Sequence, residues 1–335
     1  MTRLIKMFLL ATALVFCVFS MAQATDYPAK DISGTIQWGA GGTTDIISRA
    51  VTPAVEKLLG KKIVLMNRPG ATGAIATQYV HSQAADGYNI LYGAENPQIY
   101  KVLDIAPLDY TTNFFPVNIL ARGVPIIVCN NDQPWKTIKE LLDDAKKNPG
   151  KIKMGTTGTG GVPHVVGNMI KTVDKITFNQ IPFDGDGPGV TALLGGHTQF
   201  TIATLTAVRE HVRAGRLRPL AIVSDKPVAG LEAVPLITSY NKDYGKYLPW
   251  GPFFGVFVKK EVPDDVKKKL VDVYLKGSQD PQFLTLIRDL GGIPLGLVEG
   301  EAEKFIRHWQ SVTSWLLHEA EATKASPEKF GIPKP

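Results

Sequence analysis

The sequence predicts an α/β fold of two domains built on mostly parallel sheets. Short β-like runs alternate with amphipathic helical patterns along most of the chain. A strand, a glycine–threonine turn and a helix also follow one another twice, once in each half. The length of 335 residues suits about two domains of roughly 100–200 residues each. A hydrophobic content of 44% with 20% charged residues is typical of a globular chain with a substantial core.

The first strand–turn–helix unit lies near the N-terminus. Residues 32–38 read as a strand, and residues 39–44 (GAGGTT) follow as a turn. From Ile46 to Leu59, apolar side chains recur at three- and four-residue spacing, which predicts an amphipathic helix that ends at Gly60. The same half is expected to hold strands at 62–66 and 89–92 and a helix at 74–82.

The second unit repeats this layout. Residues 151–155 lead into a turn at 156–161 (TTGTGG), and a helical stretch follows at 162–172. A strand at 126–129 and a helix at 135–147 precede it. The remaining predicted elements are strands at 178–183, 198–203, 218–224 and 254–258 and helices at 264–278, 281–290 and 299–325. Two matching units in separate halves favour two similar lobes.

The first 24 residues have the layout of a secretory signal. Arg3 and Lys6 provide a basic start, residues 7–20 an apolar run, and residues 22–24 an A-x-A cleavage site. We therefore expect cleavage near Ala24 and an exported, periplasmic protein. No later apolar run approaches the ~18 residues that a membrane helix needs.

Charge and cysteine content narrow the possible partners. Removing two basic residues with the signal lowers the formal net charge from +6 to +4, spread thinly along the chain. No run of Lys and Arg with interleaved aromatic residues is present, so we expect no nucleic-acid partner. Cys129 is the one cysteine outside the signal, and its apolar neighbours predict a buried core residue and no intrachain disulfide.

The two glycine–threonine turns have the chemistry of an anion site. A strand that opens into a helix presents unpaired backbone N–H groups at the positive end of the helix dipole, and glycine lets a ligand approach the backbone. The threonine hydroxyls either cap the helix or donate to an oxygen ligand. The turns then hold a carboxylate, or each is only a tight turn that caps its own helix.

Phosphate and dinucleotide sites fit the turns poorly. Neither turn contains the lysine of a P-loop. In the first turn, Thr44 stands where the dinucleotide fingerprint has its third glycine, and the next strand ends at Asn67, where an acidic ribose partner is expected. We therefore expect no cofactor.

Catalytic and metal-binding patterns are absent from the sequence. It contains no G-x-S-x-G, and its six histidines include no H-E-x-x-H. Asp184 and Asp186 lie in a Gly/Pro-rich segment. They either form a general-base pair or bond to the local backbone of a turn. Trp250, Phe253 and Phe254 either form the wall of a ligand site or pack in the core. We expect no catalytic residues and no metal site.

Seven segments, in this order along the chain, resemble motifs of the tripartite tricarboxylate transporter receptors, the TctC or Bug family of periplasmic binding proteins. They are GGTTDIISR (41–49), NRPGATG (67–73), ADGY (85–88), NPGK (148–151), PFDG (182–185), LLGG (193–196) and AGRLRPLA (214–221). The likeness covers nearly the whole chain after the signal, and the ordered set is more specific than any one segment.

The resemblance implies a two-lobed, type II periplasmic-binding-protein fold. Each lobe is expected to be a mixed, mostly parallel sheet flanked by helices. Residues 25–122 plus 252–335 would form the first lobe, which is discontinuous, and residues 123–251 the second. Such a receptor is a monomer without enzymatic activity that closes on a small carboxylate, a di- or tricarboxylate or an aromatic acid. It delivers this ligand to a membrane permease of the tripartite tricarboxylate transporter type.

The resemblance also implies the residues of the binding site. Two loops grip one carboxylate group, the first with Gly41, Gly42, Thr43 and Thr44 and the second with Thr156, Thr157, Gly158 and Thr159. Four further positions complete the set, namely Trp38, Asn96, Asp184 and Thr204. Asp184 stands where members commonly carry Lys, Thr204 where they commonly carry Asp, and the lead from Trp38 to Ala40 also departs from the family pattern.

Two other functions are compatible with the sequence. A secreted hydrolase would use Asp184 and Asp186 as acid and base. A solute sensor would present its liganded form to a histidine kinase, and the sequence does not separate this function from transport.

Overall fold

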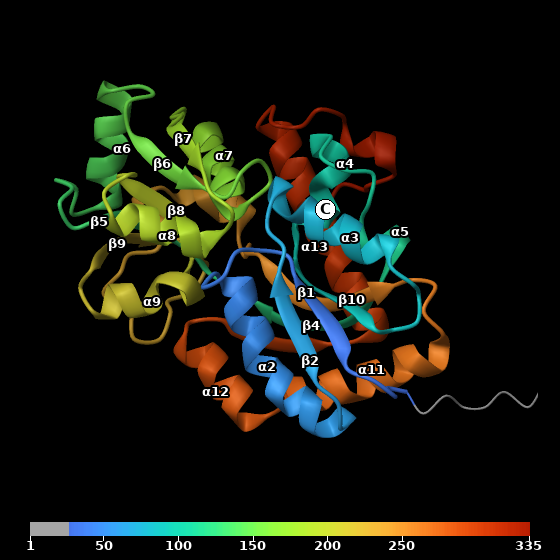
Figure 1. Ribbon diagram of the computed structural model, residues 1–335. Helices are drawn as coiled ribbons and strands as arrows, with labels where there is room; N and C mark the ends of the chain where they lie inside the picture. The colour runs from blue at the N-terminus through green and yellow to red at the C-terminus, as the bar shows by residue number, and fades with distance from the viewer. Residues whose placement is uncertain (1–26) are drawn as a thin grey trace, which may run out of the picture.

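The computed structural model describes residues 27–335 and arranges them in two lobes, each a mixed sheet flanked by helices (Figure 1). The predicted fold class is therefore confirmed. The predicted signal at residues 1–24 lies outside the described residues. Within residues 27–335, no helix has both the length and the apolar character needed to cross a membrane.

Lobe 1 is built on a six-stranded sheet of order β11-β4-β10-β3-β1-β2. Its strands are β1 (Ile32–Ile36), β2 (Ile63–Asn67), β3 (Asn89–Ala94), β4 (Phe114–Arg122), β10 (Phe253–Lys259) and β11 (Ile293–Leu297). Its longer helices are α2 (Thr43–Leu59), α3 (Ala74–Ser82), α11 (Asp264–Ser278), α12 (Pro281–Asp289) and α13 (Glu299–Glu319). Its short helices are η1 (Ala71–Gly73), η2 (Asn96–Ile99), α4 (Tyr100–Leu103), α5 (Tyr110–Asn113) and η4 (Pro327–Phe330).

Lobe 2, green to yellow in Figure 1, is built on a five-stranded sheet of order β7-β6-β8-β5-β9. Its strands are β5 (Pro125–Asn130), β6 (Lys153–Thr156), β7 (Asn179–Pro182), β8 (Phe200–Thr204) and β9 (Leu217–Ile222). Its helices are α6 (Ile138–Lys147), α7 (Val162–Asp174), α8 (Asp186–Leu194), α9 (Leu205–Arg213), α10 (Ile237–Tyr240) and η3 (Lys242–Tyr247).

The chain passes between the lobes twice. It enters lobe 2 between β4 and β5 and returns between η3 and β10. The two crossings lie side by side, because the backbone N–H of Gly123 donates to the carbonyl of Pro252 at 2.8 Å. The domain boundaries expected at 122/123 and 251/252 fall within these crossings. A paired, two-segment connection of this kind can act as a hinge.

Antiparallel pairs take a larger share of both sheets than the alternation of strands and helices predicts. Strand β1 pairs in parallel with β2 and β3, and β6 with β7 and β8, but the remaining pairs are antiparallel. Strands β5 and β10, which follow the crossings, run against both of their neighbours. Strands β4 and β11 were not predicted, because Pro116 and Asn118 interrupt the first apolar run and Pro294 and Gly296 the second.

Most predicted elements agree with the structure to within a few residues, and the differences have local causes. Helix α6 begins at Ile138, not at residue 135, because Thr137 and Glu140 form a capping box. Helix α13 ends at Glu319 rather than at residue 325. Helix α8 begins at Asp186, inside the segment that the glycines and prolines predicted to be a turn.

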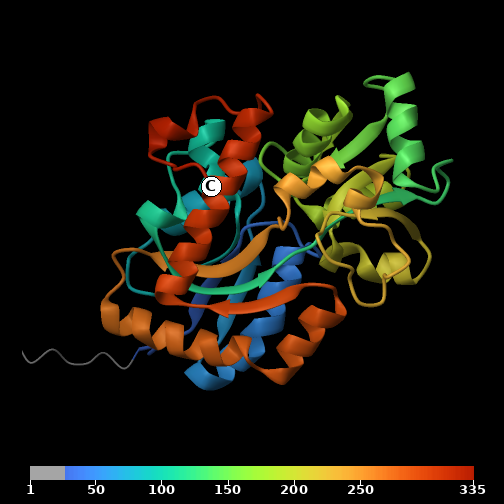
Figure 2. The ribbon, with the colours of Figure 1, turned by 180° about the vertical axis from the view of Figure 1, so that it is seen from behind.

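The C-terminal helices cover lobe 1 and hold the second crossing. Helices α11 and α12 pack on α2, and α13, red in Figure 2, packs on β4 and also touches α7 of lobe 2. The indole N–H of Trp309 donates to the carbonyl of Gly251 at 2.8 Å, and that of Trp250 donates to Thr313 at 3.0 Å. Phe253 packs edge-on against Trp309, with ring centroids 5.5 Å apart. Trp250 and Phe253 therefore belong to the core.

Cys129 is a free, buried cysteine on β5, as predicted. Burial raises the pKa of its thiol to about 11, so the reactive thiolate is scarce at neutral pH. This supports a packing role for the side chain.

Asp45, in the first turn of α2, shapes the loop between β1 and α2. Its carboxylate accepts hydrogen bonds from the N–H of Gly41 at 3.0 Å, from Nε of Arg49 at 2.8 Å and from Nδ2 of Asn67 at 2.9 Å. The residue is only 5% exposed. Because these donors come from three segments, one carboxylate holds the glycine turn, the helix and the end of β2 together.

We predict that Asp45→Ala lowers the free energy of unfolding by about 2–3 kcal/mol, because it removes the buried charged acceptor of three partly buried hydrogen bonds. Asp143→Ala serves as the control, since Asp143 forms only an exposed i,i+4 pair with Lys139, which solvent screens. Urea denaturation of both variants measures the difference. Equal losses would show that Asp45 does not hold the loop.

Candidate ligand-binding site

A small cavity lies between the lobes, at the carboxyl ends of β1, β3, β6 and β8. Its volume is about 30 Å³, which at roughly 10–15 Å³ for each water position is room for about two water molecules. Lobe 1 contributes Trp38, Gly42, Thr43, Thr44, Ala94, Glu95 and Asn96, lobe 2 contributes Thr157, Gly161, Val162, Gly185, Asp186 and Thr204, and the second crossing contributes Pro252 and Phe254. Phe254 thus forms a wall of the cavity, unlike Trp250 and Phe253.

Four helices begin at this cavity without a side-chain cap. The N-cap residues are Gly42 for α2, Gly161 for α7, Gly185 for α8 and Thr204 for α9. The three glycines have no side chain to cap with, and the side chain of Thr204 makes no bond to its helix. The first turns of these helices therefore keep backbone N–H groups that the helix itself cannot satisfy. Together with the positive ends of the helix dipoles, these groups make the cavity suitable for a negatively charged oxygen.

The lobes touch each other around the cavity. The hydroxyl of Thr43 donates to Asp186 Oδ2 at 3.1 Å, and Asn96 Nδ2 donates to the carbonyl of Gly160 at 2.9 Å. The N–H of Gly39 donates to the carbonyl of Asp184 at 3.0 Å. Because all three bonds join lobe 1 to lobe 2, the structure is a closed form.

Glycine is required where the two backbones meet. A Cβ atom added at Gly39 would lie 2.7 Å from the carbonyl oxygen of Asp184 in the other lobe. That distance is shorter than a side-chain carbon can approach a backbone oxygen. A side chain at position 39 would therefore hold the lobes apart.

Two carboxyl groups face the cavity. Glu95 follows β3 and is 3% exposed, and burial raises its pKa to about 8. Burial also raises the pKa of Asp186 to about 6, although its contacts with Thr43 and Thr204 favour the carboxylate. Among the described residues, the cavity lining contains no Lys, Arg or His.

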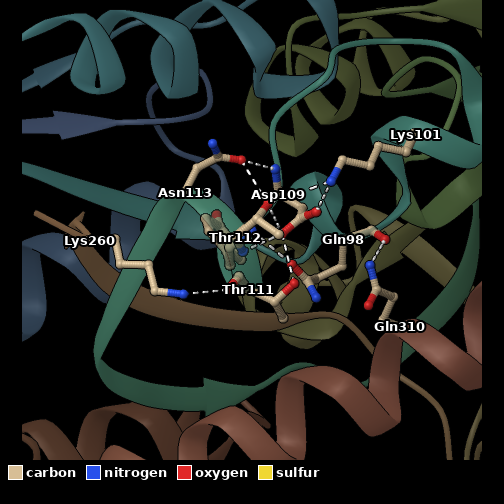
Figure 3. A network of polar contacts seen from close by, with 9 residues as sticks. Gln98, Lys101, Asp109, Thr111, Thr112, Asn113, Lys260 and Gln310 are labelled. Atoms are coloured by element: carbon tan, nitrogen blue, oxygen red, sulfur yellow. Dashed lines mark hydrogen bonds and ion pairs between the residues drawn. The ribbon is translucent and has the colours of Figure 1, made fainter. Parts of the chain in front are cut away.

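A polar network around Gln98 and Asp109 (Figure 3) is connected to the segment that carries Glu95 and Asn96. The side-chain oxygen of Gln98 accepts the N–H of Tyr110 at 2.9 Å, and the hydroxyl of Tyr110 donates to the carbonyl of Ala94 at 2.7 Å. Gln310 of α13 donates to the carbonyl of Gln98 at 2.9 Å, and Lys101 pairs with Asp109. This end of the cavity is therefore rigidly placed.

The structure brings seven of the twelve expected site residues to the cavity, namely Trp38, Gly42, Thr43, Thr44, Asn96, Thr157 and Thr204. The other five do not line it. Gly41 turns its N–H to Asp45, and Thr156 is buried at the end of β6. Gly158 and Thr159 face η1, where Thr72 donates to the carbonyl of Thr159 at 2.9 Å.

Asp184 is the clearest correction to the expected site. Its side chain is exposed, and only its backbone carbonyl takes part in the contact between the lobes. Asp186, two residues later, lines the cavity instead because α8 begins there. The two carboxyl groups therefore do not face one site as an acid–base pair. Within residues 27–335, no group of three or more His, Cys, Asp or Glu residues is arranged to hold a metal ion.

Glu95 is the most important cavity residue that was not predicted. Its sequence signal is a charged residue directly after the apolar strand 89–94, next to the expected Asn96. Gly161 and Gly185 were also not predicted as site residues. The expected second arm ends at Thr159, two positions before Gly161, and the segment in which α8 begins was expected to be a turn.

Comparison with known proteins agrees with this geometry. Residues 47–316 match the family described as the tripartite tricarboxylate transporter family receptor. Protein BugT of Bordetella pertussis is 30% identical over 265 residues, which cover 78% of this chain and 79% of that protein. The solved periplasmic binding protein BugD is 26% identical with a TM-score of 0.80, covering 92% of this chain and 100% of that chain.

A protein of R. palustris solved with adipate has the same fold, with a TM-score of 0.81 and 23% identity over 88% of this chain and 98% of that chain. The family match spans most of the chain and includes the second arm, at residues 156–159. This chain therefore belongs to the tripartite tricarboxylate transporter receptor family.

Proposed function

We propose that this protein is a periplasmic solute receptor that binds a small organic carboxylate between its lobes and delivers it to a membrane permease of the tripartite tricarboxylate transporter type. The observation that carries the proposal is the meeting of four uncapped helix N-termini in one closed cavity. The adipate bound by a protein of the same fold is consistent with this ligand class.

Backbone donors alone suffice to hold a carboxylate in such a cavity. Between closed lobes the effective dielectric is low, so each aimed N–H group interacts with an anion more strongly than it would in water. The hydroxyls of Thr44 and Thr157 add further donors. A ligand gains these contacts from both lobes only when they are closed, so it shifts the population toward the closed form.

Entry and release require the lobes to separate. The cavity of about 30 Å³ is enclosed by contacts between the lobes, and the two adjacent crossings at Gly123 and Pro252 form the connection about which they can move. A permease that recognises the closed form would then receive only liganded receptor. The predicted signal segment supports a periplasmic location.

The proposed receptor catalyses no reaction. It works as a single chain. Among residues 27–335, the cavity lining offers threonine hydroxyls and two carboxyl groups, but no Ser, Cys, His or Lys to act as an activated nucleophile. Asp184, the expected partner of Asp186 in a hydrolase, is exposed outside the cavity.

We predict that a panel of organic acids, with and without amino groups, includes ligands that stabilise the protein without being consumed. At a concentration 100 times the dissociation constant, a ligand adds about 2.7 kcal/mol, which raises Tm by several degrees. Thermal shift identifies the ligand, and NMR of the mixture follows its integrity. If no acid in the panel raises Tm, the proposal fails. Product formation that Asp184→Asn abolishes would favour the hydrolase.

We predict that Gly39→Ala weakens binding of the acid found in this way by roughly tenfold or more, because the added methyl group meets the carbonyl of Asp184 and opposes closure. Gly245→Ala is the matched control, since a Cβ atom there has no neighbour within 4 Å. Calorimetry measures both affinities, and Tm of the ligand-free variants is expected to stay near the wild-type value. Equal affinities for the two variants would argue against binding between closing lobes.

A further inference from the structure

Two buried oxygen atoms on residues that line the cavity have no hydrogen-bond partner among the described residues. They are Oε2 of Glu95 and Oδ1 of Asn96. Glu95 is 3% exposed and Asn96 is 1% exposed. Both residues line the cavity and follow the end of β3. Buried polar atoms are almost always paired in native proteins, so two orphaned oxygens at one end of a cavity point to a missing partner.

The orientation of the Asn96 amide is set by the protein. Its Nδ2 donates to the carbonyl of Gly160 at 2.9 Å and lies 3.3 Å from Oε1 of Glu95. The nitrogen is thereby occupied, and the oxygen is left as an acceptor. An amide oxygen cannot donate, so its partner in the ligand must be a donor.

The chemistry of this end of the cavity therefore differs from that of the helix N-termini. The backbone N–H groups of Thr43 and Thr44, in the first turn of α2, call for an acceptor, and a carboxylate supplies one. Asn96 Oδ1 calls for a donor, and so does Glu95 when it is ionised, and a carboxylate cannot provide one. No Lys or Arg among the described cavity residues fills that role.

We propose that the ligand carries a protonated amino group as well as a carboxylate, and is thus an amino acid whose ammonium group is bound by Glu95 and Asn96. This inference rests on the proposed function and narrows its ligand class. An ammonium group offers three donors, enough for both orphaned oxygens, and compensates the buried charge of Glu95. Asp186 already accepts from Thr43, and its charge at the cavity further favours a cationic group.

The titration of Glu95 gives the inference a second, independent readout. The ionisable groups that influence Glu95 are Asp186, Tyr100 and Tyr110, and burial raises the pKa of both tyrosines so that they stay neutral. With a pKa of about 8, Glu95 holds its proton at pH 7 when no ligand is bound. An ammonium group favours the ionised form, so its binding releases that proton to solvent.

The sign of the pH dependence follows directly. Affinity for an amino acid is expected to rise between pH 6 and pH 8, because less work is needed to ionise Glu95. Affinity for an acid that lacks the amino group is expected to fall over the same range, because an ionised Glu95 repels a carboxylate and a protonated one donates to it.

The test compares acids that differ only in the amino group, using the mature protein and calorimetry at pH 6 and pH 8. The pairs are L-aspartate with succinate, L-glutamate with glutarate, and L-alanine with propionate, and the remaining natural amino acids extend the series. We expect the ligand to be an amino acid that binds at least tenfold more tightly than its partner acid, with affinity that rises with pH.

Glu95→Gln keeps the shape of the side chain and removes its charge. We expect it to weaken amino-acid binding by roughly 10- to 100-fold, which is the loss of affinity expected when a hydrogen bond to a charged group is removed. Binding of the partner acid should be unchanged or stronger. Asp184→Asn removes an exposed carboxylate two residues from Asp186 and is the control, expected to bind like the wild type.

A melting curve establishes that Glu95→Gln is folded. An acid whose pKa is raised by folding lowers stability progressively as the pH rises from its unfolded value toward its folded value. The ligand-free variant should therefore melt at a higher temperature than the wild type at pH 8 and at a similar temperature at pH 5.

Three results would overturn the inference. Tighter binding of the acids without amino groups would do so, and so would an affinity for amino acids that falls as the pH rises. Both results leave the proposed function standing, because a carboxylate is still bound. If neither series binds, the proposed function fails and this inference fails with it. The comparison of ligand pairs on the wild type needs no variant.

Discussion

The backbone N–H groups at the start of α2, α7, α8 and α9 are the constraint on which the site depends. A helix cannot satisfy its own first N–H groups, and here no N-cap side chain does so. In the open form water fills that role. When the lobes close, water is restricted to a cavity with room for about two molecules, so an oxygen-bearing ligand becomes the natural partner of these groups.

Closure and recognition are therefore the same event. The crossings at Gly123 and Pro252 are joined by one backbone hydrogen bond, and α13 anchors the second crossing through Trp309. The contacts of Thr43 with Asp186 and of Asn96 with Gly160 form only across the closed gap. A ligand that touches both lobes adds to these contacts, and this difference in affinity is what drives the population shift.

Glu95 and Asp186 are unusual in a cavity built for an anion. Burying a carboxyl group costs stability unless a partner compensates it, and Glu95 has an oxygen without one among the described residues. The cost is concentrated at the end of β3, which the network around Gln98 and Tyr110 holds in place. A cavity with donors at one end and acceptors at the other is matched to a ligand that carries both charges.

Local pattern in the sequence determined the elements and part of the site. The apolar spacing of residues 46–59 predicts α2. The glycine–threonine turns place Thr43 and Thr44 at the start of α2 and Thr157 directly after β6, and all three line the cavity. These features are local because helix periodicity, glycine turns and caps depend on neighbours a few residues away.

Only the tertiary structure decided which loops face one another. In the folded chain, Gly158 and Thr159 face η1, and the side chain of Asp184 lies outside the cavity. Glu95, directly after β3, lines the same cavity as the starts of α7, α8 and α9, which begin more than 60 residues later. The tertiary structure also set the antiparallel pairing of β5 and β10. These outcomes follow from two chain crossings and the closure of two lobes, and they involve residues too far apart in sequence for any local pattern to report their contact.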